Sequence, residues 1–294
     1  MNGRNKTKKY LHRGATTYLL LLLLLPSASK SEVVSCIDKQ GKTLFTDNKT
    51  LCANKNIAAV KITPKCGKKV AYKHQVNYCK PRRAYQRAGR NWAIYLEKSL
   101  VESDKILADK ALLKLEKNLN EIIGILPANP ARKLKELDIY LMWGKKSPNG
   151  GRAGGMSYIR PGETNNYFYL DPRWQHAIII YSAKTLMYLD DVWTKKALMH
   201  ELAHAWHISN WPQRHPPIYE AYLSAKEAGL YQNIKDYKGK DIDTAYALKN
   251  QMEYFADLSS VYFVGGNYFP FNKKGLSTYD PNAIKMLREL WGGE

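Results

Sequence analysis

The sequence predicts an α+β fold for the larger part of the chain, with a small disulfide-bonded β module in front of it. Apolar residues recur at helical spacing over residues 104–126 and 194–205, which predicts amphipathic helices. Short apolar segments at 138–143 and 177–181 predict buried strands between these helices. All four cysteines lie ahead of this region, which indicates a separate module.

Residues 1–29 have the pattern of a secretory signal peptide. Five basic residues precede the apolar run 18–25, and small residues follow at 27–29. The run is too short to span a bilayer, and a retained N-terminal anchor is the alternative. No later stretch approaches membrane-spanning length, so we expect no transmembrane segment after cleavage and export to the periplasm or the cell exterior.

The positive charge is concentrated near the N-terminus. Of 46 basic and 26 acidic residues in the chain, residues 30–90 hold 15 basic and 3 acidic ones, whereas residues 91–294 hold 26 and 23. A basic module ahead of a nearly neutral domain suggests contact with an anionic envelope polymer. Solvated lysines that only aid solubility are the alternative.

Four cysteines in an exported chain predict two disulfide bonds. Segments 33–38 and 42–46 have the composition of short strands around a turn at residues 39–41, which favours the sequential bridges Cys36–Cys52 and Cys66–Cys79 among three possible pairings. A four-cysteine zinc site is disfavoured because the spacings contain no CxxC pair.

Residues 36–47 resemble a small β-domain of unknown function found near the N-terminus of many bacterial envelope proteins. The resemblance implies an envelope setting and assigns no activity. Residues 80–83 are basic and contain a proline, which is typical of a linker. We therefore expect a β module at 30–80, a linker at 81–90 and the main domain at 91–294.

The main domain begins with an expected strand at 91–96, followed by the amphipathic helix at 104–126, which Pro127 and Pro130 should end. Strands are expected at 138–143, 156–160 and 177–181. The glycine pairs at 150–151 and 154–155 indicate a flexible loop. They lack the spacing of a phosphate-binding loop, so a nucleotide site is not expected.

His200, Glu201 and His204 form an HExxH motif inside an uninterrupted helical segment. Two histidines four residues apart on a helix face the same side, where one Zn²⁺ ion can bind both imidazoles. Glu201 lies on the same turn and can act as general base towards a metal-bound water. The motif therefore predicts a catalytic zinc site.

A catalytic zinc site needs a third protein ligand. His207 does not fit the HExxHxxGxxH pattern, and His215 lies on an expected loop between Arg214 and Pro216. Glu253 lies in a helical apolar segment, where an unpaired carboxylate is costly, so it is the expected ligand. Asp257 follows one turn later and can accept the N–H of a ligating histidine.

The HExxH motif, together with residues 253–257, resembles the glutamate zincins, most closely the catalytic domain of anthrax lethal factor and its bacterial relatives. The resemblance extends more faintly from residue 91 to the C-terminus. It implies that His200, His204 and Glu253 bind zinc, that Glu201 activates water, and that Tyr246, seven residues before Glu253, stabilises the transition state. Relatives often have Glu where this chain has Asp257.

These expectations describe an exported zinc metallopeptidase, an endopeptidase that hydrolyses peptide bonds by attack of zinc-bound water. A peptide or protein substrate is expected to add its backbone to the edge of the sheet before the motif helix. The rival interpretation is a non-catalytic, zinc-containing envelope protein that binds an anionic polymer through residues 30–90. A structural zinc site normally has four protein ligands, and only three are evident, which favours the enzyme.

Overall fold

The structure is a computed structural model that describes residues 83–292, except 149–150, 167–169, 237–238 and 267–268, and the backbone of two earlier strands. The chain divides into two compact units, residues 1–64 and 65–294. The first unit contains β1 (Val34–Ile37) and β2 (Thr43–Thr46), which pair antiparallel and lie within the two segments expected as strands. The expected signal peptide and the cysteine pairings lie outside the described residues.

The second unit is built around a mixed five-stranded sheet. Its order is β3 (Tyr85–Arg87), β4 (Ala93–Glu97), β5 (Asp138–Leu141), β7 (Ala177–Ile180) and β6 (Met156–Ile159). The three inner strands are parallel, and the two outer strands run antiparallel to their neighbours. The strands expected at 91–96, 138–143, 156–160 and 177–181 are confirmed.

The outer strand β3 lies inside the segment expected as a linker at 81–90. Its three residues pair with β4, and the backbone amide of Lys98 donates to the carbonyl of Ala84. Residues 85–87 are therefore part of the sheet. The segment is too short and too polar to give a strand pattern in the sequence.

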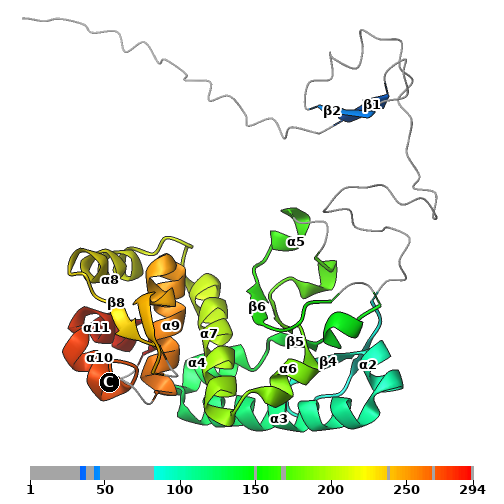
Figure 1. Ribbon diagram of the computed structural model, residues 1–294, viewed down its shortest axis with the longest axis horizontal. Helices are drawn as coiled ribbons and strands as arrows, with labels where there is room; N and C mark the ends of the chain where they lie inside the picture. The colour runs from blue at the N-terminus through cyan, green and yellow to red at the C-terminus, as the bar shows by residue number, and fades with distance from the viewer. Residues whose placement is uncertain are drawn as a thin grey trace, which may run out of the picture. The chain divides into compact units, whose positions relative to one another are not determined.

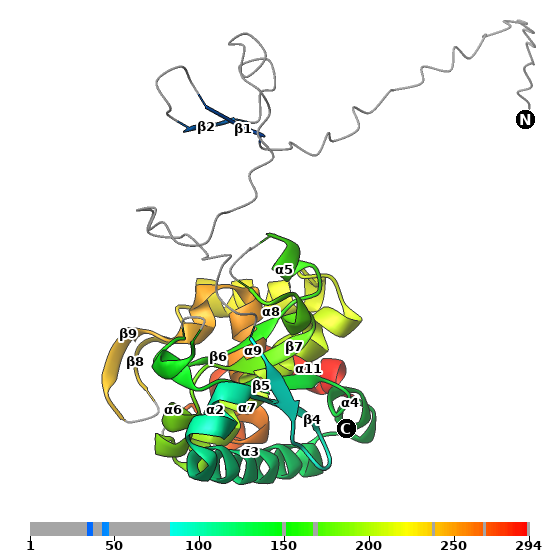
Figure 2. The same ribbon diagram turned by 90° about the vertical axis from the view of Figure 1, so that its right-hand side faces the viewer.

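Several helices cover one face of the sheet, where Ile94, Ile139 and Ile178 are fully buried. They are α2 (Lys98–Ser103), α3 (Lys105–Ile125), α4 (Ala128–Leu134), α6 (Ala183–Tyr188) and α7 (Asp191–Asn210). Figures 1 and 2 show α3 running below α6 and the lower end of α7, and it packs against both. η1 (Gly144–Lys146) connects β5 to β6 and packs against α6, whereas α5 (Glu163–Asn166) and η2 (Pro172–Trp174) connect β6 to β7, and Trp174 of η2 is buried against the opposite face.

Helix α3 confirms the prediction for residues 104–126. The Asp104 side chain accepts from the Leu107 amide and so caps the helix, and Leu115, Leu119 and Ile122 are fully buried. The chain leaves the helix before Pro127, as expected. Pro130 does not act as a breaker, because it lies in the first turn of α4, where a missing backbone N–H costs little.

The described part of the chain that follows α7 lies on the far side of this helix from the sheet (Figure 1). It comprises α8 (Pro216–Glu227), β8 (Gln232–Lys235), β9 (Asp241–Thr244), η3 (Tyr246–Lys249), α9 (Gln251–Phe263), α10 (Lys273–Tyr279) and α11 (Pro281–Trp291). Trp291 stacks between Trp206 and Phe255, with ring centroids 5.6 and 5.9 Å away. This stack joins α11 to α7 and α9.

The described residues therefore form a mixed α and β structure, which confirms the predicted class at that level. Among them, no helix is both long enough and apolar enough to cross a bilayer.

Candidate metal centre

Helix α7 presents the two motif histidines on one side, as the spacing predicted. The Asp190 side chain accepts from the Trp193 amide at 2.7 Å and starts the helix, which continues without Gly or Pro to Asn210. Leu198, Leu202 and Ala205 are fully buried and fix its rotation against the core. The outcome is a rigid support for His200 and His204.

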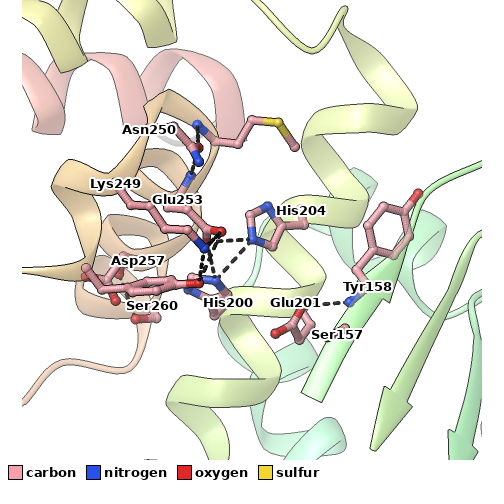
Figure 3. A network of polar contacts seen from close by, with 12 residues as sticks. Ser157, Tyr158, His200, Glu201, His204, Lys249, Asn250, Glu253, Asp257 and Ser260 are labelled. Carbon is pink, nitrogen blue, oxygen red and sulfur yellow. Dashed lines mark hydrogen bonds and ion pairs between the residues drawn. The ribbon is translucent and has the colours of Figure 1, made fainter. Parts of the chain in front are cut away.

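Glu253 comes from the first turn of α9, which packs against α7. The Asn250 side chain caps this helix, because its Oδ1 accepts from the amides of Met252 and Glu253 at 2.9 and 3.0 Å. The cap fixes the direction in which the helix starts. Glu253 is thereby held opposite the two histidines (Figure 3).

Three ligand-type atoms converge at this point. The Oε2 atom of Glu253 lies 3.0 Å from His200 Nε2 and 3.1 Å from His204 Nε2, and the two nitrogens are 3.1 Å apart. Among the described residues these three form the group that could hold a metal ion. The side chains are only 13–15 % exposed.

The donor set fits a cation. A bound cation takes a lone pair from each imidazole, and His200 and His204 turn the same nitrogen, Nε2, to one point beside the Glu253 carboxylate. Zinc takes imidazole nitrogen and carboxylate oxygen at about 2.0–2.2 Å, which places tetrahedral ligand atoms roughly 3.3–3.5 Å apart. Separations of 3.0–3.1 Å therefore need only small adjustments.

The electrostatic surroundings of Glu253 and His200 also favour positive charge at this point. Burial raises the pKa of Glu253, but hydrogen bonds with His200 and His204 outweigh it and hold the pKa far below the ordinary value. Burial lowers the pKa of His200, but the hydrogen bond with Glu253 and nearby carboxylates raise it overall. The pocket thus favours an anionic Glu253 with a positive partner.

The Glu201 side chain extends from α7 towards the sheet, not towards Glu253 (Figure 3). Its Oε2 accepts the backbone N–H of Tyr158 at 2.7 Å (Figure 3). Tyr158 belongs to β6, the outer strand nearest α7 in the described sheet. The carboxylate of Glu201 is therefore fixed beside β6, on the sheet side of the group formed by His200, His204 and Glu253.

Tyr246 lies beside the candidate ligand Glu253. Its hydroxyl donates to Glu253 Oε1 at 3.2 Å, its ring centroid is 5.9 Å from that of His200, and 53 % of the residue is exposed. The structure brings it to the site that the zincin resemblance implies. Its role in stabilising a transition state stays a prediction.

The two histidines rejected as third ligands lie away from the group. His207 is fully buried, pairs through Nε2 with the carbonyl of Pro212 at 3.1 Å and packs edge-on to Phe255. His215 stacks on the ring of Trp211, with centroids 5.1 Å apart. Neither converges with Glu253.

Asp257 is close enough to His200 to contribute to its raised pKa. Among the described residues, no hydrogen bond joins Asp257 to His200 or His204, and His204 Nδ1 is buried without a partner. The expected hydrogen bond from a ligating histidine to Asp257 therefore stays a prediction.

Lys249 is at the site and was not singled out from the sequence. Its Nζ lies 2.9 Å from the hydroxyl of Tyr246 and 3.4 Å from Glu253 Oε1. The signal was its position four residues before Glu253, on the same side of a helical segment.

A scan of protein-family models and searches of curated proteins and of solved structures found no match to this chain.

Proposed function

We propose that this chain is an exported zinc metallopeptidase of the glutamate-zincin type. The observation that carries the proposal is the convergence of His200, His204 and Glu253 on one point, with Glu201 bonded to the outer strand β6 of the described sheet. The expectation of export rests on the composition of residues 1–29.

His200 and His204 through Nε2, and Glu253 through Oε2, would hold the zinc ion. Bound zinc supplies a Lewis acid that polarises a peptide carbonyl and makes water acidic enough to attack near pH 7. Glu201 takes the proton from the attacking water and passes it to the leaving amine. Tyr246, whose hydroxyl donates to Glu253 Oε1 in this structure, would turn that proton to the developing oxyanion.

The edge of β6 offers a site for the substrate backbone. The amide of Tyr181 donates to the carbonyl of Gly155. Because hydrogen-bonded positions alternate along an antiparallel strand, the backbone groups of Gly155, Ser157 and Ile159 face β7. Met156 and Tyr158 therefore direct their backbone groups away from β7, and the outward Tyr158 amide donates to Glu201. An extended peptide that pairs by β-strand addition with the other outward groups of β6 would pass next to Glu201.

The decisive experiment compares Glu201→Gln with His204→Ala. A glutamine oxygen can still accept the Tyr158 amide, so the first variant keeps the local structure and about one zinc per chain. It loses the general base, and peptide hydrolysis should fall at least about 100-fold, the low end for such catalysis. His204→Ala removes a ligand, so zinc content and hydrolysis should fall together.

Zinc analysis and a proteome-derived peptide library provide the measurements. A Glu201→Gln variant that retains zinc and full activity would contradict the role of Glu201. A wild-type protein that holds zinc yet cleaves no peptide would instead favour the non-catalytic binding protein.

A further inference from the structure

The 3₁₀ helix η3 brings a cationic group, the ammonium of Lys249, to the site formed by His200, His204 and Glu253. In a 3₁₀ helix, side chains three residues apart lie one above the other. Tyr246 and Lys249 are therefore on the same side of η3, with Lys249 Nζ 4.8 Å from the Tyr246 ring centroid and 2.9 Å from its hydroxyl. Asn250 then starts α9 and turns Glu253 towards the same place.

As a result, the two oxygens of Glu253 have different partners. Oε2 contacts only the nitrogens of His200 and His204 among the described residues. Oε1 accepts from the Tyr246 hydroxyl at 3.2 Å and from Lys249 Nζ at 3.4 Å. Figure 3 shows Lys249 reaching the carboxylate from the side opposite α7.

This division matters because a carboxylate can bind a metal ion through one oxygen or both. A catalytic zinc keeps one position open for water or substrate, and a second oxygen from Glu253 can occupy it. A neutral hydroxyl competes weakly with a divalent cation for Oε1. An ammonium group competes better, because its positive charge attracts the carboxylate in addition to the hydrogen bond that it donates.

We propose that Lys249 is a positioning residue that holds Oε1 of Glu253 and the hydroxyl of Tyr246, so that Glu253 offers the metal a single oxygen. The inference rests on the proposed metal site, and it deepens the proposed function by assigning a residue that keeps a coordination position open. Lys249 touches neither substrate nor metal in this arrangement. It acts through Glu253 and Tyr246.

The fold should tolerate loss of this lysine. The Lys249 side chain is 56 % exposed, and exposed ion pairs contribute about 0–1 kcal/mol to stability. Lys249→Met keeps the length of the stem and removes the charge. Lys249→Arg keeps the charge, and Lys105→Met removes an exposed lysine that pairs with Asp109 at the same four-residue spacing elsewhere in the unit.

The test uses the protein loaded with Co²⁺, because the intensity of its visible d–d absorption falls as the number of ligands rises. Lys249→Met should bind Co²⁺ with the same stoichiometry as wild type and show weaker absorption, which indicates one additional ligand. Its zinc-dependent peptide hydrolysis should fall about 10–100-fold, the usual effect of removing a partner of a metal ligand. Lys249→Arg should restore most of both properties, and Lys105→Met should resemble wild type.

An unchanged Co²⁺ spectrum in Lys249→Met overturns the inference, whatever the activity. Weaker absorption in Lys249→Met in a protein that hydrolyses no peptide supports the role of Lys249 and contradicts the peptidase. A wild-type protein that binds neither Co²⁺ nor Zn²⁺ overturns both, because no metal site then exists to be shaped.

Discussion

The three histidines of α7 have different environments. His200 and His204 turn Nε2 to a shared point, whereas His207, one turn later, is fully buried. The Nε2 atom of His207 donates to the carbonyl of Pro212, and its Nδ1 is buried without a partner. A second proton on this ring would have no acceptor, so His207 stays neutral in the folded protein.

The buried ring of His207 makes the folded protein sensitive to acid. Burial lowers its pKa from 6.5 to about 4. Below pH 6.5 the unfolded chain binds a proton that the folded protein does not accept, so stability falls as the pH decreases from 6.5 to 4. One pKa unit corresponds to about 1.4 kcal/mol, so the loss reaches about 3 kcal/mol at most.

The matched variant for this effect is His207→Gln, which does not titrate and can still donate to Pro212. Urea unfolding of the metal-free proteins at pH 7 and at pH 4.5 is the measurement. We expect the variant to be less stable at pH 7 and to lose less stability on acidification than wild type. Equal losses in the two proteins would show that His207 titrates normally.

The chemistry-bearing residues of the site could be predicted to different degrees. His200, Glu201 and His204 are defined by local spacing, and Glu253 by a charge in an apolar helix. Lys249 could not be recognised, because the chain holds 46 basic residues and ion pairs at four-residue spacing are common on exposed helices. Its role depends on which oxygen of Glu253 it contacts, which is a matter of tertiary structure.

Single helices also determine where the candidate metal ligands lie, and the start of α9 is the clearest example. Asn250 Oδ1 accepts from two amides, one of them that of Glu253 itself. Removing the cap frees the first turn, in which Glu253 lies. The direction of a ligand and the stability of a helix are therefore set by one side chain.

Asn250→Ala should destabilise the protein by about 1 kcal/mol, the usual cost of losing such a cap. It should also weaken zinc binding, because Glu253 is no longer held towards His200 and His204. Asn250→Asp retains an acceptor at the same place and serves as the control. Urea unfolding and competition with a zinc-binding dye measure the two effects, and equal zinc affinity in all three proteins would contradict this account of the cap.

Elements were predictable where their pattern is long. The helix α3 covers 21 residues with regular apolar spacing, and its limits agree with the prediction to within a residue or two. The strand β3 has three residues in a basic segment, so its pairing with β4 leaves no sequence signal. Short strands are selected by the neighbours they pair with, which one sequence does not reveal.

In the whole molecule, the site depends on segments that are far apart in the sequence. α7 and α9 meet although α8 and the β8–β9 hairpin lie between them in the chain, and Asp280 helps to fix α9 by accepting from the hydroxyls of Tyr231 and Tyr254. Contacts of this range have no local signature. The ligand set could be proposed from the sequence, but not the support behind it.

The first described strand of the second unit, β3, matters for the stability of the whole sheet. Tyr85 of β3 packs edge-on to Tyr140 at 4.8 Å, its hydroxyl accepts from the Trp174 indole at 2.9 Å, and the Arg173 guanidinium covers its ring at 4.5 Å. Residues 83–90 therefore complete the sheet face that lies opposite α3 and α7.

A protein that starts at residue 83 should fold and retain the zinc-dependent hydrolysis proposed above, whereas one that starts at residue 91 should be less stable by about 2 kcal/mol. The second protein loses a half-buried aromatic side chain, which contributes less than the roughly 3–5 kcal/mol of a fully buried one, and it exposes β4 as a new edge. Tyr85→Ala in the longer protein separates the two contributions, because it removes the side chain and keeps the strand. Urea unfolding of the three proteins is the measurement, and equal stability of the two truncated forms would show that β3 contributes nothing to the sheet.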